Sequence, residues 1–230
     1  MSNDTMNILA IDTATSYLQL AMAYGGDRMV NSSNDVGRLQ GQVILKKIEE
    51  LFESTELRPA DLDVIVVCIG PGSFTGLRVG IAAAKSIAEV VDAHVVGVTM
   101  FDMIAERLPD REEVVWAMVP SRRDEVYLAR IKSGQVEGDS IDVYADQKVA
   151  DTVANDLMYA ISIDVPGRFP GIKTEADGGL IHPTAADLLR VGTRRALAGQ
   201  FDDLVLLEPL YLQKAIAEIR FDERQRRSAD

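Results

Sequence analysis

The most informative segment of the chain reads Gly70-Pro71-Gly72-Ser73-Phe74-Thr75-Gly76-Leu77-Arg78-Val79-Gly80. It follows an apolar run over 64–68 and opens a pattern with helical spacing. A strand, a glycine turn and the first turn of a helix are therefore compressed into about a dozen residues. Such a turn directs backbone N–H groups outward at a helix N-terminus, where an anion or another backbone can approach closely. The segment is thus either a phosphate-binding loop or a tight packing joint.

Three known nucleotide or nucleophile motifs do not fit this segment. A Walker loop ends in Gly-Lys-Ser/Thr, and no lysine follows Gly70 or Gly72 at the required place. The dinucleotide fingerprint requires a third glycine where Thr75 stands. A serine nucleophile elbow requires glycines two residues to either side of Ser73, and Pro71 and Thr75 occupy those places. The helix after the turn is therefore more informative than the turn itself.

The predicted helix over 75–92 carries a stripe of small residues. Gly76, Gly80, Ala83 and Ala84 share one face of this helix. A stripe of this kind lets another backbone approach unusually closely. Glycine inside a helix costs about 1 kcal/mol relative to alanine, so Gly80 implies a compensating gain from packing. Packing against the chain's own sheet and packing against a partner subunit both satisfy this requirement.

The net charge restricts the partners of the chain. Its 230 residues include 36 acidic and 24 basic side chains, which gives a formal net charge of −12. Such a chain repels a phosphate backbone on average. Extensive nucleic-acid binding by this chain alone is therefore not expected.

Cysteine, histidine and hydropathy indicate the compartment and the chemistry. Cys68 is the only cysteine and lies in an apolar run, so no internal disulfide can form. His94 and His182 are far apart in sequence, and no metal site is predicted. The first seven residues are largely polar and no apolar stretch approaches about 20 residues, so neither a signal peptide nor a membrane span is predicted. We expect a cytoplasmic protein.

The order of predicted elements divides the chain into two lobes. The first lobe follows a β-β-β-α-β-α-β-α order, with elements predicted at 7–11, 17–23, 28–30, 39–55, 64–69, 75–92, 95–98 and 100–108. A polar break follows, and the strand pattern then restarts. The second lobe is expected to have strands at 114–119, 125–132 and 136–144, helices at 147–158 and 184–198, and a loop over 164–182. The predicted domains are therefore an N-terminal lobe, 1–108, and a reduced C-terminal lobe with the tail, 109–230.

The segment after the first strand is a candidate nucleotide site. Actin-like ATPases and sugar kinases place their first phosphate loop at this position, as an acid followed by small hydroxyl residues. Here Asp12, Thr13 and Thr15 supply those groups, but no glycine follows the acid. The alternative is that the same residues cap their own tight turn.

Four blocks together resemble the TsaB (YeaZ) family: 8–15, 70–81, 122–127 and 209–212. The resemblance implies an α/β protein with the two-lobed actin/Hsp70/sugar-kinase-like (ASKHA) fold. It also implies a bacterial, non-catalytic partner of the transferase TsaD. With TsaE and a threonylcarbamoyl-AMP synthase, that system forms N6-threonylcarbamoyladenosine (t6A) at position 37 of tRNAs that read ANN codons.

The resemblance further implies where partners bind. The helices over 39–55 and 75–92 would contact TsaD or, in its absence, a second copy of the chain as a homodimer. The implied contact residues are Gln42, Leu45, Gly72, Ser73, Phe74, Thr75, Gly76, Arg78, Val79, Gly80, Ala83 and Ala84. No intrinsic cofactor is implied; ATP or ADP and metal are expected on the partner or at a shared interface, and tRNA is reached only through the complex. On this basis Gly80→Leu is expected to abolish partner binding while the lobe still folds.

Three places depart from the family pattern. Gln40-Gly41 stands where relatives usually begin their first helix with His-Ser, and Pro120-Ser121-Arg122 stands where Asp-Ala-Arg is usual. Gln213 replaces a common arginine. These departures indicate a divergent branch of the family.

Two other functions compete with the scaffold. A small-molecule kinase or ATPase of the same fold superfamily would turn over ATP alone and lose this activity in Asp12→Ala. The missing glycine after Asp12 and the weak adenosine motif Gly178-Gly179 count against it. A peptidase would need paired metal ligands or a nucleophile motif, and neither is present in the sequence.

Overall fold

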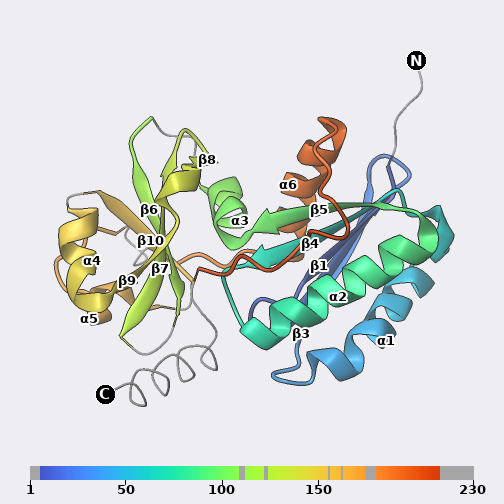
Figure 1. Ribbon diagram of the computed structural model, residues 1–230, viewed down its shortest axis with the longest axis horizontal. Helices are drawn as coiled ribbons and strands as arrows, with labels where there is room; N and C mark the ends of the chain where they lie inside the picture. The colour runs from blue at the N-terminus through green and yellow to red at the C-terminus, as the bar shows by residue number, and fades with distance from the viewer. Residues whose placement is uncertain are drawn as a thin grey trace, which may run out of the picture.

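The computed structural model describes residues 6–108, 112–121, 124–154, 156–161, 163–174 and 180–212. Two sheets stand side by side with helices packed against them (Figure 1). Arg122, Gly178-Gly179 and Gln213, which were singled out above, lie outside the described ranges. Within those ranges no helix is both long enough and apolar enough to cross a bilayer.

The first sheet has the strand order β3-β2-β1-β4-β5. Its strands are β1 (Ile8–Asp12), β2 (Tyr17–Tyr24), β3 (Arg28–Asp35), β4 (Val64–Gly70) and β5 (His94–Thr99). The first three strands are antiparallel, and β4 and β5 run parallel to β1. The helices that follow are α1 (Gln40–Glu53), α2 (Phe74–Val91) and α3 (Met100–Arg107), with a short 3₁₀ turn η1 (Pro59–Asp61) before β4. The predicted element order of the first lobe is confirmed.

Both faces of the first sheet are covered. In β1, Ile8 and Ala10 join a core with α3 and α6 (Ala185–Leu197), whereas Leu9 and Ile11 join a core with α1 and α2. Figure 1 shows α6 on the opposite side of the sheet from α1 and α2. A strand that is buried on both faces needs apolar side chains at every position. This explains why β1 and β4 appear in the sequence as uninterrupted apolar runs.

The second sheet has the strand order β10-β6-β7-β8, and β9 also pairs with β7. Its strands are β6 (Val115–Pro120), β7 (Glu125–Lys132), β8 (Gln135–Val136), β9 (Asp142–Ala145) and β10 (Leu157–Ala160). Its helices are α4 (Asp146–Val153) and α5 (Val165–Arg168), with a 3₁₀ turn η2 (Gly138–Ser140) between β8 and β9. A third apolar cluster, which includes Met118, Val149 and Val165, lies between this sheet and its helices.

The sequence-based boundaries were wrong in three parts of the second lobe. The helix predicted at 147–158 ends at Val153, and 157–160 form β10, which pairs in parallel with β6. The strand predicted at 136–144 is interrupted by η2, and the loop predicted at 164–182 contains α5. An apolar run of four residues is too short for its periodicity to distinguish a strand from a helix.

The helix α6 belongs with the first sheet in space. A Cβ on Gly192 would overlap the side chain of Val66, so α6 packs directly on β4. Beyond α6, Asp202 pairs with Val95, and its carboxylate accepts a hydrogen bond from the Gly97 N–H (2.7 Å). The domain division at residue 108 stays a prediction, but α6, which was grouped with the second lobe, packs against the first.

After α6 the chain runs along β5 at the edge of the first sheet and contacts one side of α2. Lys85 Nζ donates a hydrogen bond to the Val205 carbonyl (2.8 Å), and Leu210 N–H donates to the Ile69 carbonyl (2.8 Å). The segment 201–212, which we call the C-terminal strap, therefore attaches to the first lobe and ends between the two lobes.

Candidate functional site

The glycine segment forms the joint between β4 and α2. Ser73 caps the helix, because its Oγ accepts a hydrogen bond from the Gly76 N–H (3.2 Å) and its carbonyl accepts one from Leu77 N–H (2.8 Å). The Ser73 N–H donates to the Ala14 carbonyl (2.7 Å). A Cβ on Gly72 would lie 2.5 Å from the same carbonyl oxygen. These N–H groups are engaged by the chain itself, so the turn acts here as a packing joint with the β1–β2 loop.

The small-residue stripe of α2 packs against the same loop. Thr13 Oγ1 donates a hydrogen bond to the Gly76 carbonyl (2.7 Å). A Cβ on Gly76 would overlap the Thr13 carbonyl oxygen, and a Cβ on Gly80 would overlap Thr13 Oγ1. Ala83 and Ala84 are buried as well. This packing argues against the expectation that Gly80→Leu leaves the lobe folded, because Gly80 is buried and a side chain there would overlap Thr13.

Other predicted contact residues lie on the outer side of α1 and α2. Leu45 is 65% exposed and Phe74 is 44% exposed. The two helices meet where a Cβ on Gly41 would lie 3.6 Å from Val79 Cγ2, and Leu45 follows Gly41 by about one helical turn. Among the remaining predicted contact residues, Gln42, Ser73, Thr75 and Arg78 are exposed. Gly72 and Val79 are half-buried. We call Leu45, Phe74, Arg78 and Val79 the outer helical face.

Aromatic side chains hold Arg78 at the N-terminal end of α2. Its guanidinium carbon lies 4.0 Å from the centroid of the Phe74 ring, and its Nε donates a hydrogen bond to Tyr211 Oη (3.0 Å). The two rings have centroids 5.8 Å apart. The C-terminal strap is thus attached to the outer helical face. The sequence offered the 209–212 block as a family signature but no sign of this contact.

Asp12 is completely buried, and its carboxylate is used inside the chain. Its oxygens accept hydrogen bonds from Ala14 N–H (2.8 Å) and from Gln19 Nε2 (3.3 Å). Burial raises the pKa of Asp12 from 3.8 to about 6, while hydrogen bonds to Ala14, Cys68 and Gln19 act in the opposite direction. Asp12 therefore caps its own turn, which was the alternative to nucleotide binding.

Asp12→Asn is expected to stabilise the protein above pH 6. The folded-state pKa lies above the unfolded value, so the contribution of Asp12 to stability is full below about pH 4 and is lost as pH rises through about 6. The neutral amide avoids this loss, which amounts to roughly 3 kcal/mol. Urea unfolding at pH 4 and pH 7.5 measures this difference in the free energy of unfolding. The variant should be more stable than wild type only at pH 7.5. If the variant and wild type differed in stability by the same amount at both pH values, the raised pKa of Asp12 would be contradicted.

Thr13 and Thr15 differ in what they contact. Thr13 is fully buried against α2, whereas Thr15 is half-buried and lines a cavity. The Thr15 carbonyl accepts a hydrogen bond from Gln40 Nε2 (2.5 Å). Gln40, one of the departures from the family pattern, therefore ties the start of α1 to the β1–β2 loop. The sequence offered no signal for this role.

Thr13→Val is expected to destabilise the fold by about 1–3 kcal/mol, because it leaves the buried Gly76 carbonyl without its hydroxyl donor. Thr13→Ser keeps the donor and should retain most of the stability. Chemical denaturation of the two variants measures the difference. Equal stability of the valine and serine variants would show that the hydroxyl has no structural role.

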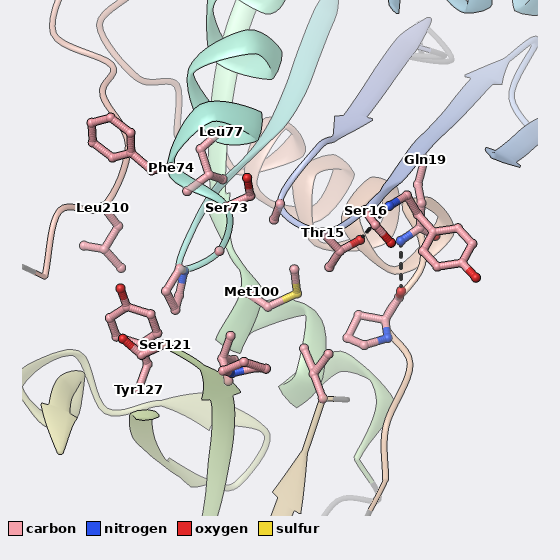
Figure 2. A pocket seen from close by; sticks show the side chains of 18 of the residues that line it. Thr15, Ser16, Gln19, Ser73, Phe74, Leu77, Met100, Ser121, Tyr127 and Leu210 are labelled. Atoms are coloured by element: carbon pink, nitrogen blue, oxygen red, sulfur yellow. Dashed lines mark hydrogen bonds between the residues drawn. The ribbon is translucent and has the colours of Figure 1, made fainter. Parts of the chain in front are cut away.

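A cavity of about 1100 Å³ lies between the two lobes. Figure 2 shows Met100 near its centre, with Ser73 and Thr15 on one side and Ser121 and Tyr127 on the other. Among the described lining residues there is no lysine, arginine, aspartate or glutamate. Within the described part of the chain, no group of three or more His, Cys, Asp and Glu side chains could hold a metal ion.

Comparison with known proteins adds to this geometry. Residues 35–206 match a family model described as TsaD: tRNA N6-adenosine threonylcarbamoyltransferase. The chain is 27% identical to the tRNA threonylcarbamoyladenosine biosynthesis protein TsaB of Bacillus subtilis (strain 168), over 96% of this chain and 100% of the relative. It is 24% identical to the protein of the same name in Escherichia coli (strain K12), over 92% of this chain and 96% of the relative.

A solved structure supports the same relationship. It is described as YeaZ from Pseudomonas aeruginosa and is 26% identical to this chain, with a TM-score of 0.75. The match covers 90% of this chain and all of the other. Together with the strand order and the family model, it confirms the predicted α/β fold of the actin/Hsp70/sugar-kinase-like type.

Proposed function

Because the chain belongs to the family of the matched model and, within it, to the TsaB (YeaZ) proteins, we propose that it is a non-catalytic partner that activates TsaD. The relatives support a role in t6A biosynthesis. In this proposal the product is t6A at position 37 of tRNAs that read ANN codons, and TsaE takes part in the same cytoplasmic system. The chain meets tRNA only through the complex, which agrees with its net charge of −12.

The outer helical face is the observation that carries this proposal. Leu45 and Phe74 expose large apolar side chains on adjacent helices, and the guanidinium of Arg78 lies over the Phe74 ring. Exposed apolar side chains that cluster with arginine and an aromatic ring are typical of protein interfaces. The face suits TsaD or, in the absence of TsaD, a second copy of the chain.

The interior of the first lobe supports a non-catalytic role. Asp12 is the acid expected to hold metal or water in a kinase of this fold, but here it is buried and bonded to Ala14 and Gln19. Thr13, the next candidate, uses its hydroxyl to hold α2. In this proposal ATP or ADP and any metal are therefore bound by the partner or at a shared interface.

Reconstitution tests the proposal. The chain is mixed with TsaD from the same organism, and complex formation is followed by size-exclusion chromatography with light scattering, which also reports any homodimer of the chain alone. Formation of t6A is measured on transcribed tRNA with TsaD, TsaE and the synthase present, with and without the chain. We expect a complex and a requirement for the chain. ATP turnover by the isolated chain that is lost in Asp12→Ala would instead establish the kinase or ATPase alternative.

A further inference from the structure

Three arginine side chains form a row where α6 lies against the end of α3. Arg107 is the last residue of α3, and Arg190 and Arg194 lie one turn apart on α6. Two carboxylates alternate with them. Arg107 Nη1 donates a hydrogen bond to Asp187 Oδ2 (3.3 Å), and Arg190 donates to both Asp187 and Glu106. Arg194 Nη2 donates to Glu106 Oε2 (2.8 Å). We call Arg107, Arg190 and Arg194 the arginine row.

The outer surface of the arginine row is positively charged, although the chain carries a net charge of −12. The side chains of Arg107, Arg190 and Arg194 are 41%, 52% and 67% exposed. The carboxylates lie beneath them, because the side chain of Glu106 is only 15% exposed and that of Asp187 is completely buried. Three guanidinium groups share two carboxylates, so one positive charge is left without a carboxylate partner in this network.

A structural role explains only part of the arginine row. Asp187 is fixed at the N-terminus of α6, where it also accepts hydrogen bonds from the Thr184 N–H (2.7 Å) and the Thr184 hydroxyl (2.8 Å). Arg190 alone contacts both carboxylates and so joins α6 to α3. Arg107 and Arg194 each make one hydrogen bond to the described residues, although a guanidinium carries five N–H donors. Most of their donors therefore have no partner in the described part of the chain.

The arginine row lies apart from the two surfaces described above. Figure 1 shows α6 on the opposite side of the first sheet from α1 and α2, which carry the outer helical face. None of the three arginines lines the cavity between the lobes. A protein bound to the outer helical face would therefore leave the row uncovered. In the proposed reaction tRNA is the macromolecular polyanion that comes to the complex, and guanidinium groups bind phosphates through paired hydrogen bonds.

We propose that the arginine row binds phosphate groups of the tRNA backbone once TsaD has brought tRNA to the complex. This contact rests on the proposed function, because the isolated chain repels RNA on average through its net charge of −12. Phosphate contacts position a nucleic acid and carry no base information. The row therefore adds affinity for any tRNA and does not select among tRNAs.

Two double variants of equal net charge isolate the arginine row. The row variant, Arg107→Gln/Arg194→Gln, removes the two outer guanidinium groups, while Arg190 still pairs with both carboxylates. The control variant is Arg58→Gln/Arg130→Gln. Its side chains are 80% and 42% exposed in the wild type, and each likewise pairs with one carboxylate. A difference between the two variants therefore comes from the position of the charges and not from their number.

Binding of transcribed tRNA to the complex of TsaD with each variant is measured by fluorescence anisotropy between about 50 and 200 mM salt. The row variant should bind tRNA about tenfold more weakly at the lower salt concentration. The slope of log K against log salt should become shallower by about 1.5, because each lost phosphate contact removes roughly 0.7–0.9. In the t6A assay the KM for tRNA should rise about tenfold while the maximal rate is unchanged. The control variant should match wild type in all three measurements.

Complex formation is measured first, by size-exclusion chromatography, and circular dichroism checks folding; if the row variant does not fold, the single variant Arg194→Gln replaces it. If the wild-type chain does not bind TsaD, the proposed function fails. The arginine row is then tested on the isolated chain at about 50 mM salt, where the row variant should still bind tRNA more weakly than the control variant. Equal tRNA affinity of the two variants would overturn the proposal. A row variant that loses affinity for TsaD but not for tRNA would identify a protein contact and would overturn it too.

Discussion

Gly80→Leu is expected to lower the free energy of unfolding by about 3 kcal/mol or more, because overpacking a core typically costs 1–3 kcal/mol and occasionally more. A Cβ at this position already overlaps Thr13 Oγ1, and leucine adds three further carbon atoms beyond it. Domains of this size are stable by only about 5–15 kcal/mol, so much of the protein should be lost to the insoluble fraction. The yield of soluble protein and its urea-unfolding midpoint measure the effect.

A control and a double variant test the cause of this loss. Gly41 is also a helical glycine, but its Cβ would only touch Val79, so Gly41→Ala should be neutral or stabilising by up to about 1 kcal/mol. Gly80→Ala should cost less in a Thr13→Ala background, where the overlapping oxygen is gone and the remaining Cβ lies 3.4 Å away. A folded Gly80→Leu protein with a wild-type midpoint would restore the view that Gly80 lies on a partner surface.

Leu45→Glu is expected to weaken TsaD binding by about 100-fold while the chain stays folded. The side chain is 65% exposed, so glutamate costs little in the free protein. In an interface the same carboxylate would be desolvated next to apolar surface without a designed partner. Central apolar positions can contribute about 2 kcal/mol or more to binding, which corresponds to a factor of tens to hundreds. Isothermal titration of TsaD with each variant measures this effect.

The matched control is Leu197→Glu. Leu197 is 61% exposed and ends α6, which covers the other face of the first sheet. This variant should bind TsaD with wild-type affinity and support t6A formation. If Leu197→Glu loses binding and Leu45→Glu does not, the partner contacts the α6 side, and the assignment of the outer helical face is wrong.

The first lobe could be predicted from sequence because its signals are local. β1 and β4 are continuous apolar runs that must be buried on both faces, and α2 begins at a capping serine after a glycine turn. The packing partner of the small-residue stripe could not be predicted. A helical wheel identifies which residues are small but not which backbone lies against them. Here that backbone belongs to Thr13, more than sixty positions earlier in the chain.

The candidate site was harder to predict from the sequence, because it depends even more on contacts between residues that are far apart in the chain. Ser121 was noted only as a departure from a family pattern, and its place beside the cavity is evident only once both lobes are in place. Gln40 was noted for the same reason, and its bond to Thr15 joins residues from different elements. Asp12 was identified correctly as a special residue, but its burial, which determines its role, follows from the packing of Gln19 and the elements around it.

The helix α6 packs on the first sheet but lies near the end of the chain, and this order has a consequence during protein synthesis. Gly192 covers Val66 on β4, yet the ribosome makes Val66 more than a hundred residues earlier. At about 5–20 residues per second, the part of this face that α6 covers stays exposed on the nascent chain for roughly 6–25 seconds. A fragment that stops at residue 108 would keep α3 on this face but would leave the area under α6 permanently exposed. We therefore expect the emerging chain to bind chaperones through this area until α6 has left the exit tunnel.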